Sequence, residues 1–491
     1  MEQTPFLQIH PTDNVAVALM DLQPGFRAGD VVLKDAVGRG HKFAVTAIAA
    51  GEMVRKYGAP IGHATQDIAA GEMVHTHNLK TNLDGTEVYT YTPQLPAEAK
   101  AAEIPEFMGY RRSDGNVGIR NELWIIPTVG CVNKTAELLA KRYQTTAENV
   151  TGPYAFTHPY GCSQLGEDHA TTRAILANLV HHPNAAGVLV VALGCENNTL
   201  EDFKKEIGDI DPDKVRYMTV QQESDEIAKG MELLAELEKN AARYQREPIP
   251  VSELRVGLKC GGSDGLSGIT ANPLVGAFSD KLIACGGTSV LTEVPEMFGA
   301  ETLLMERCRN KEVFDRCVEM VNGFKDYFIS HGQVVYENPS PGNKAGGIST
   351  LEEKSLGCTQ KGGTSVVTDV QKYTGRLSQK GLNLTAGPGN DMVAVTALTA
   401  AGVHLILFTT GRGTPLGAPA PTVKIATNTA LAEFKANWID FNAGTLVEGE
   451  SMDSAAERLF RQVIRIANGE ETQSEKYGYR EIAIFKDGVT L

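Results

Sequence analysis

Hydrophobic residues in this 491-residue chain fall into short runs, and five of these runs end in a glycine turn that carries a cysteine, a carboxylate or a basic group. Open parallel sheets bind ligands beyond the carboxyl ends of their strands, where glycine lets the backbone come close to a ligand. The pattern therefore predicts an enzyme with a pocket at the ends of parallel strands. The runs and their turns are 124–126 with 130–133, 155–156 with 158–162, 188–193 with 194–197, 254–258 with 260–265, and 405–408 with 411–413.

The first ninety or so residues have a different pattern. Residues 14–19 are typical of a strand, and little in the region resembles a long helix. The heptapeptide Ile-Ala-Ala-Gly-Glu-Met-Val occurs at 48–54 and again at 68–74. A repeated short strand with a glycine turn predicts a small, internally similar β domain, which we expect to span residues 1–92.

The rest of the chain alternates between strand and helix patterns. Residues 93–106 contain proline and small polar residues that are typical of a linker, and Pro248 and Pro250 mark a second boundary. We expect one α/β domain over 107–247 and a second over 248–491 that completes the catalytic region. The βα alternation predicts a mostly parallel sheet flanked by helices, so the fold class is α/β with an N-terminal β domain.

Helix-like periodicity occurs at 135–143, 170–179 and 223–243, and the last of these segments has a charged, solvated face. The loop 337–344 contains two prolines and two asparagines, which makes it a poor strand or helix. A polar loop within an apolar frame is a candidate for ligand contact.

Composition narrows the functional classes. Forty-six Lys and Arg against 60 Asp and Glu give a net charge of −14, which provides no general attraction to nucleic acid. The longest apolar run, near 188–193, is far shorter than the ~20 residues of a membrane span. The first five residues lack the features of a signal peptide, and the eight cysteines are scattered. These features predict a cytoplasmic protein with no membrane or nucleic-acid partner.

His75 and His77 form the sharpest local motif. If the strand that begins at 72–73 continues through them, both imidazoles face the same side. Two imidazoles on one face can bind one divalent metal ion, or they can act in acid–base catalysis without a metal. The alternative is a surface strand with two solvated histidines.

Four cysteines lie in the glycine turns: Cys131, Cys162, Cys195 and Cys260. They could share an iron or iron–sulfur site, line a pocket as free thiols, or simply pack, and none has the C-x-x-C spacing. We keep Cys162 and Cys195 as candidate metal ligands. Cys285, Cys308, Cys317 and Cys358 are expected to be structural, with Cys358 the least certain.

Glu196 and Asp264 also lie in glycine turns. Either carboxylate could bind a metal ion or act as a base, and Glu196 is included among the candidate metal ligands. The alternative for both is a carboxylate that caps its own turn.

Candidate substrate-binding residues lie in the same turns and in the polar loop. Arg412 stands between two glycines, where its guanidinium could bind a substrate carboxylate or brace the loop. Lys344, Asn197 and Ser263 are the further candidates. No phosphate-binding glycine loop is present, which argues against a nucleotide cofactor.

Together these segments resemble the altronate/galactarate dehydratase family over almost the whole chain. The resemblance implies an N-terminal β-clip domain of the SAF type, a larger α/β catalytic part, and dependence on Fe²⁺ or another divalent metal such as Mn²⁺. The motifs that carry it are 10–17, 40–43, 74–78, 160–162, 194–197, 260–273, 293–296 and 337–344.

The reaction that the resemblance implies is dehydration of D-altronate to 2-dehydro-3-deoxy-D-gluconate in hexuronate catabolism. A divalent metal would stabilise the enediolate-like state, and a histidine would protonate the leaving hydroxide. The partner would be a small sugar-acid substrate. Whether the chain also forms a homo-oligomer is left open by the sequence. The alternatives are a dehydratase of a related sugar acid such as galactarate, and a non-catalytic sugar-binding protein.

Overall fold

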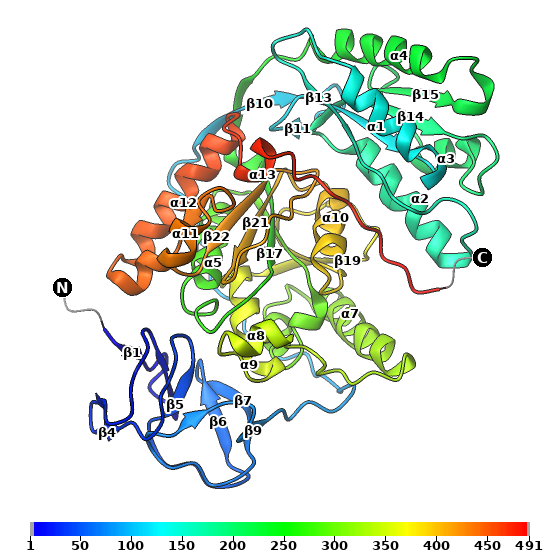
Figure 1. Ribbon diagram of the computed structural model, residues 1–491. Coiled ribbons are helices and arrows are strands. Elements are labelled where there is room, and N and C mark those ends of the chain that lie inside the picture. Colours follow the sequence, from blue (N-terminus) through cyan, green and yellow to red (C-terminus); the bar gives the residue numbers. More distant parts are fainter. Residues whose placement is uncertain (1–3, 489–491) are drawn as a thin grey trace.

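The computed structural model describes residues 4–488, which form three domains (Figure 1). The first three residues, part of the start used to exclude a signal peptide, lie outside the described chain. The N-terminal β domain and the second domain lie on opposite sides of the C-terminal domain. Within residues 4–488, no helix is both long and apolar enough to cross a lipid bilayer. The predicted α/β class with an N-terminal β domain is confirmed.

The N-terminal domain consists of short strands in small antiparallel sheets, of which the largest has the order β1-β2-β5-β8. The two copies of the repeated heptapeptide lie side by side, because Ile48 and Ile68 exchange two backbone hydrogen bonds of 2.8 Å. The repeat therefore builds a small two-fold-like core. The strands are β1 (Phe6–Leu7), β2 (Val15–Ala18), β3 (Arg27–Ala28), β4 (Val31–Val32), β5 (Lys42–Ala44), β6 (Met53–Lys56), β7 (Ala59–Ala64), β8 (Met73–Val74) and β9 (Leu79–Lys80).

The second domain has a parallel four-stranded sheet with the order β13-β12-β14-β15, and a small antiparallel sheet of β11, β10 and β16. Apolar clusters cover both faces of the parallel sheet, as expected for strands that are hydrophobic throughout. The elements are β10 (Glu106–Arg111), β11 (Val117–Gly118), β12 (Glu122–Pro127), α1 (Asn133–Arg142), β13 (Thr151–Ala155), α2 (Gly166–His181), β14 (Ala185–Ala192), α3 (Leu200–Ile207), β15 (Val215–Thr219), α4 (Glu226–Ala241) and β16 (Glu247–Pro250).

The C-terminal domain is built on a parallel seven-stranded sheet with the order β19-β20-β18-β17-β21-β22-β23. The helices predicted at 135–143, 170–179 and 223–243 are α1, α2 and α4 of the second domain. In the C-terminal domain, the loop 337–344 is partly helical, because α8 begins at Pro341 and is capped by Ser340. The elements are β17 (Arg255–Cys260), α5 (Ala271–Ala284), β18 (Thr288–Leu291), α6 (Thr302–Met305), α7 (Lys311–Ser330), α8 (Pro341–Ala345), α9 (Leu351–Thr359), β19 (Val367–Gln371), β20 (Gly381–Thr385), α10 (Asp391–Ala401), β21 (Leu405–Thr410), β22 (Thr422–Ala426), α11 (Thr429–Phe434), β23 (Phe441–Asn442), α12 (Met452–Ala467) and α13 (Gln473–Lys476).

Each parallel sheet has a point where the strand order reverses. In the C-terminal sheet the chain moves from β17 to β18 on one side and returns later to β21 on the other. In the second domain it moves from β12 to β13 and returns to β14. Ligands of open α/β sheets bind in the crevice at such a switch point. The five predicted turns are therefore divided between two switch points, three in the second domain and two in the C-terminal domain.

Two extended segments connect the domains. The segment after the N-terminal domain crosses the C-terminal domain, where the Gln94 amide donates to the Glu306 carbonyl oxygen (2.8 Å). The C-terminal segment returns over the second domain, where Ile482 and Ile484 enter its core. Arg480 forms a buried ion pair with Glu122 there (3.0 Å). The domains are thus held together by chain segments as well as by surface contacts.

A candidate active site between the N-terminal and C-terminal domains

Asp264 lies in the turn after β17, at the switch point of the C-terminal sheet. Its Oδ1 accepts hydrogen bonds from the Leu266 amide (3.1 Å) and the Ser267 hydroxyl (3.1 Å), and its Oδ2 accepts one from the Thr427 hydroxyl (3.0 Å). Burial raises the pKa of Asp264, although these hydrogen bonds oppose the shift. The carboxyl group is held firmly and keeps its proton more readily than an exposed aspartate does.

Three glycines bring the N-terminal domain into direct contact with this turn. The Gly265 amide donates to the Gly346 carbonyl oxygen (2.7 Å), and a Cβ on Gly265 would lie only 1.9 Å from the Gly40 carbonyl oxygen. Gly40 itself has a φ of +81°, in the left-handed region that favours glycine. No side chain fits at Gly265, so the backbone of the N-terminal domain rests directly on the C-terminal loops.

A buried triad of charges joins the same two domains. Lys42 Nζ lies 2.8 Å from Glu353 Oε2 and 2.6 Å from the Ser349 hydroxyl, and Lys56 Nζ lies 2.8 Å from Glu353 Oε1. The side chains of Lys42, Lys56 and Glu353 are each 1% exposed. A buried charge is costly unless it is paired, so this triad stays intact only while the domains remain docked.

The triad also sets the ionisation of its members. Burial opposes ionisation of Glu353, but the attraction of Lys42 and Lys56 outweighs it and holds the pKa of the carboxyl at about 2. Burial lowers the pKa of Lys42 to about 8, against the attraction of Glu353. Glu353 is therefore ionised across the physiological range.

His75 and His77 occupy different environments. β8 ends at Val74, and residues 75–78 form a turn in which the Asn78 amide donates to the His75 carbonyl oxygen (3.0 Å). The predicted continuation of the strand is wrong. His75 is half-buried with its Nδ1 2.7 Å from Ser349 Oγ, whereas His77 is exposed.

The imidazole of His75 is uncharged at neutral pH. Burial, followed by the charges of Lys42 and His41, lowers its pKa to about 4. The His41 ring packs edge-on against it with the ring centroids 5.3 Å apart. The imidazole therefore has a lone pair free to accept a proton, and the neighbouring cation makes it a weaker base than an exposed histidine.

The predicted substrate-binding residues of the C-terminal domain border this contact. Arg412 is exposed, and its guanidinium lies 3.4 Å from the Gly342 carbonyl oxygen, so it reaches α8. Lys344 is half-exposed on the same helix, and Asn343 donates to the Ser263 carbonyl oxygen (2.9 Å). The structure thus gathers Asp264, Ser263, Arg412 and Lys344 around one loop cluster.

A narrow cavity of about 10 Å³ lies between the two domains. Its lining includes Lys56 from the N-terminal domain and Asp264, Glu353, Lys354 and Cys358 from the C-terminal domain. The cavity therefore connects the docked surface with the thiol of Cys358, deeper in the C-terminal domain.

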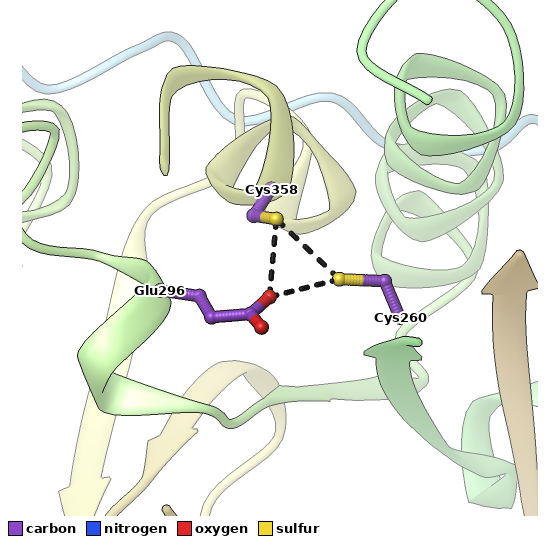
Figure 2. A group of neighbouring side chains, drawn as sticks. All are labelled: Cys260, Glu296 and Cys358. Carbon is purple, nitrogen blue, oxygen red and sulfur yellow. Dashed lines mark hydrogen bonds between the residues drawn. The ribbon is translucent and has the colours of Figure 1, made fainter. Parts of the chain in front are cut away.

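Two thiols and a carboxylate meet beyond the cavity (Figure 2). Cys260 Sγ lies 3.0 Å from Glu296 Oε2 and 3.4 Å from Cys358 Sγ, and Cys358 Sγ lies 3.2 Å from the same oxygen. All three side chains are buried, and among residues 4–488 they form the single group of at least three metal-binding side chains whose donor atoms lie within 4.8 Å of one another. The group could hold a metal ion.

Lysines surround this group. Lys361 Nζ lies 3.0 Å from Cys260 Sγ, and Lys354 Nζ lies 2.7 Å from Glu296 Oε1. Two thiolates and one carboxylate carry a charge of −3, which one divalent ion does not fully neutralise. The ammonium groups supply further positive charge, so the donor set fits a divalent ion that accepts thiolate ligands, such as Fe²⁺.

The structure places the other predicted site residues in the second domain. Glu196 accepts hydrogen bonds from the Thr128 hydroxyl (2.7 Å), the Leu193 amide (3.0 Å) and the Gly194 amide (2.6 Å), so its carboxylate caps its own turn. Asn197 Oδ1 accepts from the Ser163 amide (2.8 Å).

Cys162 and Cys195 lie in the same group of turns. Because this domain and the N-terminal domain are on opposite sides of the molecule, the structure does not bring these residues to His75 and His77 within one chain (Figure 1).

Comparison with known proteins gives a consistent result for all three domains. Residues 4–82 match the altronate/galactarate dehydratase SAF domain, residues 109–242 match the second domain of D-galactarate dehydratase/altronate hydrolase, and residues 251–490 match the C-terminal domain of D-galactarate/altronate dehydratase.

Curated relatives match the chain from end to end. It is 56% identical to an altronate dehydratase of Escherichia coli (strain K12), with 99% of this chain and 100% of the relative covered. The chain belongs to the altronate/galactarate dehydratase family. Another family member, an altronate dehydratase of Bacillus subtilis (strain 168), is 54% identical with 99% of both chains covered. A galactarate dehydratase (L-threo-forming) of E. coli is 34% identical, with 99% of this chain and 98% of the relative covered.

Several residues of this family member's site were missed in the sequence. Lys42 lies in the segment 40–43 that carries the family resemblance, and Glu296 lies in 293–296, but neither stands in a cysteine-bearing glycine turn. Glu353 and Lys361 belong to a helix and its continuation with no distinguishing pattern. A buried charged residue can be recognised in a sequence only when its partner is known. Glu353 pairs with lysines of another domain, and Lys361 contacts Cys260 at the end of a distant strand.

Proposed function

We propose that the chain dehydrates D-altronate to 2-dehydro-3-deoxy-D-gluconate and water. The observation that carries this proposal is full-length identity above one half to two altronate dehydratases, across all three domains. The site between the N-terminal and C-terminal domains supports it, because it combines an uncharged imidazole, a carboxyl group with a raised pKa and two exposed or half-exposed cationic groups.

His75 removes the proton from the carbon next to the substrate carboxylate. The electron pair of that C–H bond forms the new C=C bond, and the C–O bond on the following carbon breaks. Asp264 donates a proton to the departing hydroxyl, which leaves as water. The enol then tautomerises to the 2-keto acid. The imidazole is unprotonated at neutral pH and so has a lone pair for the proton, and burial raises the pKa of the Asp264 carboxyl, which favours its protonated form.

Arg412 and Lys344 bind the substrate carboxylate and hydroxyl groups. A guanidinium offers two parallel donors to a carboxylate, which fixes the orientation of the carbon that loses its proton. His77, exposed in the same turn as His75, contacts the outer part of the sugar acid.

The cofactor is Fe²⁺ held by Cys260, Glu296 and Cys358, rather than Mn²⁺, because two of the three donors are sulfur and Mn²⁺ prefers oxygen ligands. When bound there, the ion would supply Lewis-acid stabilisation of developing negative charge. All eight cysteines are free, which agrees with a reducing compartment, and we place the enzyme in the cytoplasm.

A panel of aldonates and aldarates, assayed for release of 2-keto acid, tests the proposal. D-Altronate should give the highest kcat/KM, and galactarate should be at least tenfold poorer, corresponding to about 1.4 kcal/mol of discrimination. Galactarate as the preferred substrate would replace altronate, and binding of sugar acids without turnover would overturn the assignment as an enzyme. Chelation should abolish turnover, and Fe²⁺ should restore it better than Mn²⁺ does.

A further inference from the structure

The second domain has a cysteine-bearing crevice of its own. Pro127 of β12 pairs with Val191 of β14. Cys131 lies four residues after Pro127, and Cys195 lies four residues after Val191. The two cysteines therefore follow their strands at the same distance from the sheet edge. The strand order reverses between these two strands, which is the position where open parallel sheets bind ligands. Cys162 follows β13, the neighbour of β12 on the other side.

Hydrogen bonds close the three turns into a ring. The Gly130 amide donates to the Tyr160 carbonyl oxygen (2.8 Å), and the Asn198 amide donates to the Gly161 carbonyl oxygen (2.9 Å). Asn198 Nδ2 also donates to the Thr128 carbonyl oxygen (3.1 Å). Each cysteine-bearing turn is therefore bonded to both of the others.

Glycine is required for this approach. Gly161 has a φ of +97°, and a Cβ there would lie 2.1 Å from the Thr128 carbonyl oxygen. Ser163, directly after Cys162, has a φ of 55°, which is uncommon outside glycine. The backbone is held in conformations that bring the three turns together, and residues in such conformations cluster at ligand sites.

The three thiols differ from the other cysteines in accessibility. Cys131 and Cys195 are exposed and Cys162 is half-buried, whereas the five remaining cysteines are buried. Exposed free thiols are prone to oxidation, so their presence together at one crevice calls for a ligand.

The spacing of the three thiols argues against a single shared metal ion. Three sulfurs around one tetrahedral ion lie roughly 3.8 Å apart, given metal–sulfur bonds of ~2.3 Å. The donor atoms of Cys260, Glu296 and Cys358 all lie within 4.8 Å of one another. The sulfurs of the three turn cysteines do not form such a group. A polynuclear cluster spans a wider set of thiolates than a single ion.

The surrounding charges favour an anionic ligand. α1, α2 and α3 all begin just after the three turns, so their N-terminal dipoles face the crevice. Arg173 on α2 reaches the ring, with its Nε 3.1 Å from Asn198 Oδ1. Thiolates and the sulfides of a cluster are negative and are stabilised by these groups.

We propose that Cys131, Cys162 and Cys195 ligate an iron–sulfur cluster of the [4Fe–4S] type, with its fourth iron open to an oxygen ligand. Each thiol loses a proton to solvent and replaces another ligand on one iron, and no oxidation state changes. This site is separate from the Cys260 ion of the proposed function, and the two can be distinguished by acid-labile sulfide, which only the cluster contains.

The test uses the full chain expressed and purified without oxygen. We expect about four acid-labile sulfides per chain, at least four irons with any excess belonging to the separate Cys260 ion, and visible absorption that dithionite bleaches. Mössbauer spectra of the Cys260→Ser variant, which lacks that separate ion, should contain one iron distinct from the other three. Absence of acid-labile sulfide would overturn the proposal, and four equivalent irons would overturn ligation by three cysteines.

Variants locate the cluster. Cys131→Ser, Cys162→Ser and Cys195→Ser should each reduce sulfide to near background, while Cys285→Ser, a buried cysteine of the C-terminal domain, should retain it. Cys260→Ser should keep the sulfide whether or not the proposed function holds, and it should lose only iron in excess of the sulfide. Sulfide that persists in the triple Cys→Ser variant would overturn the assignment, and circular dichroism of the same Cys→Ser variants checks that the loss is not due to unfolding.

Discussion

The two parallel sheets of this molecule share a topology and differ in what covers their switch points. In the C-terminal domain, the turn after β17 lies against the N-terminal domain, whose Lys42 and Lys56 enter to pair with Glu353. In the second domain, the turns after β12 and β14 carry the exposed thiols of Cys131 and Cys195.

The difference separates the two proposals. Burial at a covered switch point shifts the pKa values of the groups inside, which is suited to proton transfer to a sugar acid. An open crevice lined with thiols is suited to a preassembled inorganic ligand, which would fill the crevice by itself.

The largest effect is expected for His75→Gln in the covered site. Removing the proton acceptor should lower kcat for altronate dehydration by about 100- to 10,000-fold, with little change in folding. Steady-state kinetics on purified protein measure this effect. His63→Gln is the matched control, because His63 lies in the same domain bonded to Asn82, away from the loop cluster, and should retain activity. A loss of less than about tenfold for His75→Gln would remove it from the mechanism.

The next largest effect concerns the docking of the N-terminal domain on the C-terminal domain. Glu353→Leu leaves Lys42 and Lys56 buried without a partner and should reduce the free energy of unfolding by about 3–5 kcal/mol. Urea unfolding and protease sensitivity of the N-terminal domain report this loss. Glu247→Leu removes an exposed partner of Arg111 and should cost less than about 1 kcal/mol. Equal losses for the two variants would show that the buried triad does not hold the domains together.

Lowering the pH should weaken the contact between the N-terminal and C-terminal domains by protonating Glu353. The pKa of Glu353 is about 2 in the folded protein against an ordinary value of 4.5, so its stabilisation is complete above pH 5 and is lost as the pH falls toward 2. The shift corresponds to about 3 kcal/mol. The unfolding free energy of the wild type minus that of Glu353→Gln, measured across this range, should shrink toward low pH. A constant difference would contradict the assigned ionisation.

The smallest effect involves no change in stability and compares the two crevices directly. In metal-free native protein, a thiol reagent should label Cys131 and Cys195 rapidly and leave Cys260 and Cys358 unlabelled, as read by mass spectrometry. Rapid labelling of Cys260 would mean that the N-terminal domain opens freely and that the covered site is not closed.

Much of the fold could be predicted because its signals are local. The repeated heptapeptide indicated a small β domain, and its copies do pair at Ile48 and Ile68. The periodicity at 135–143 and 223–243 indicated helices that correspond to α1 and α4. The prediction that the strand continues through His75 was wrong, because Asn78 closes a turn that begins at His75. No pattern in the sequence distinguishes this turn from a continuing strand.

The sequence alone determined the strand ends, the residues that could do chemistry and the family resemblance, because hydrophobic periodicity and motifs are encoded along the chain. Only the tertiary structure decided how those residues are grouped. It placed the five turns at two switch points, brought Lys42 to Glu353 from another domain, and assembled Cys260, Glu296 and Cys358 from three distant segments. Such groupings depend on strand order and on burial of charges against one another, and both are properties of the packed chain.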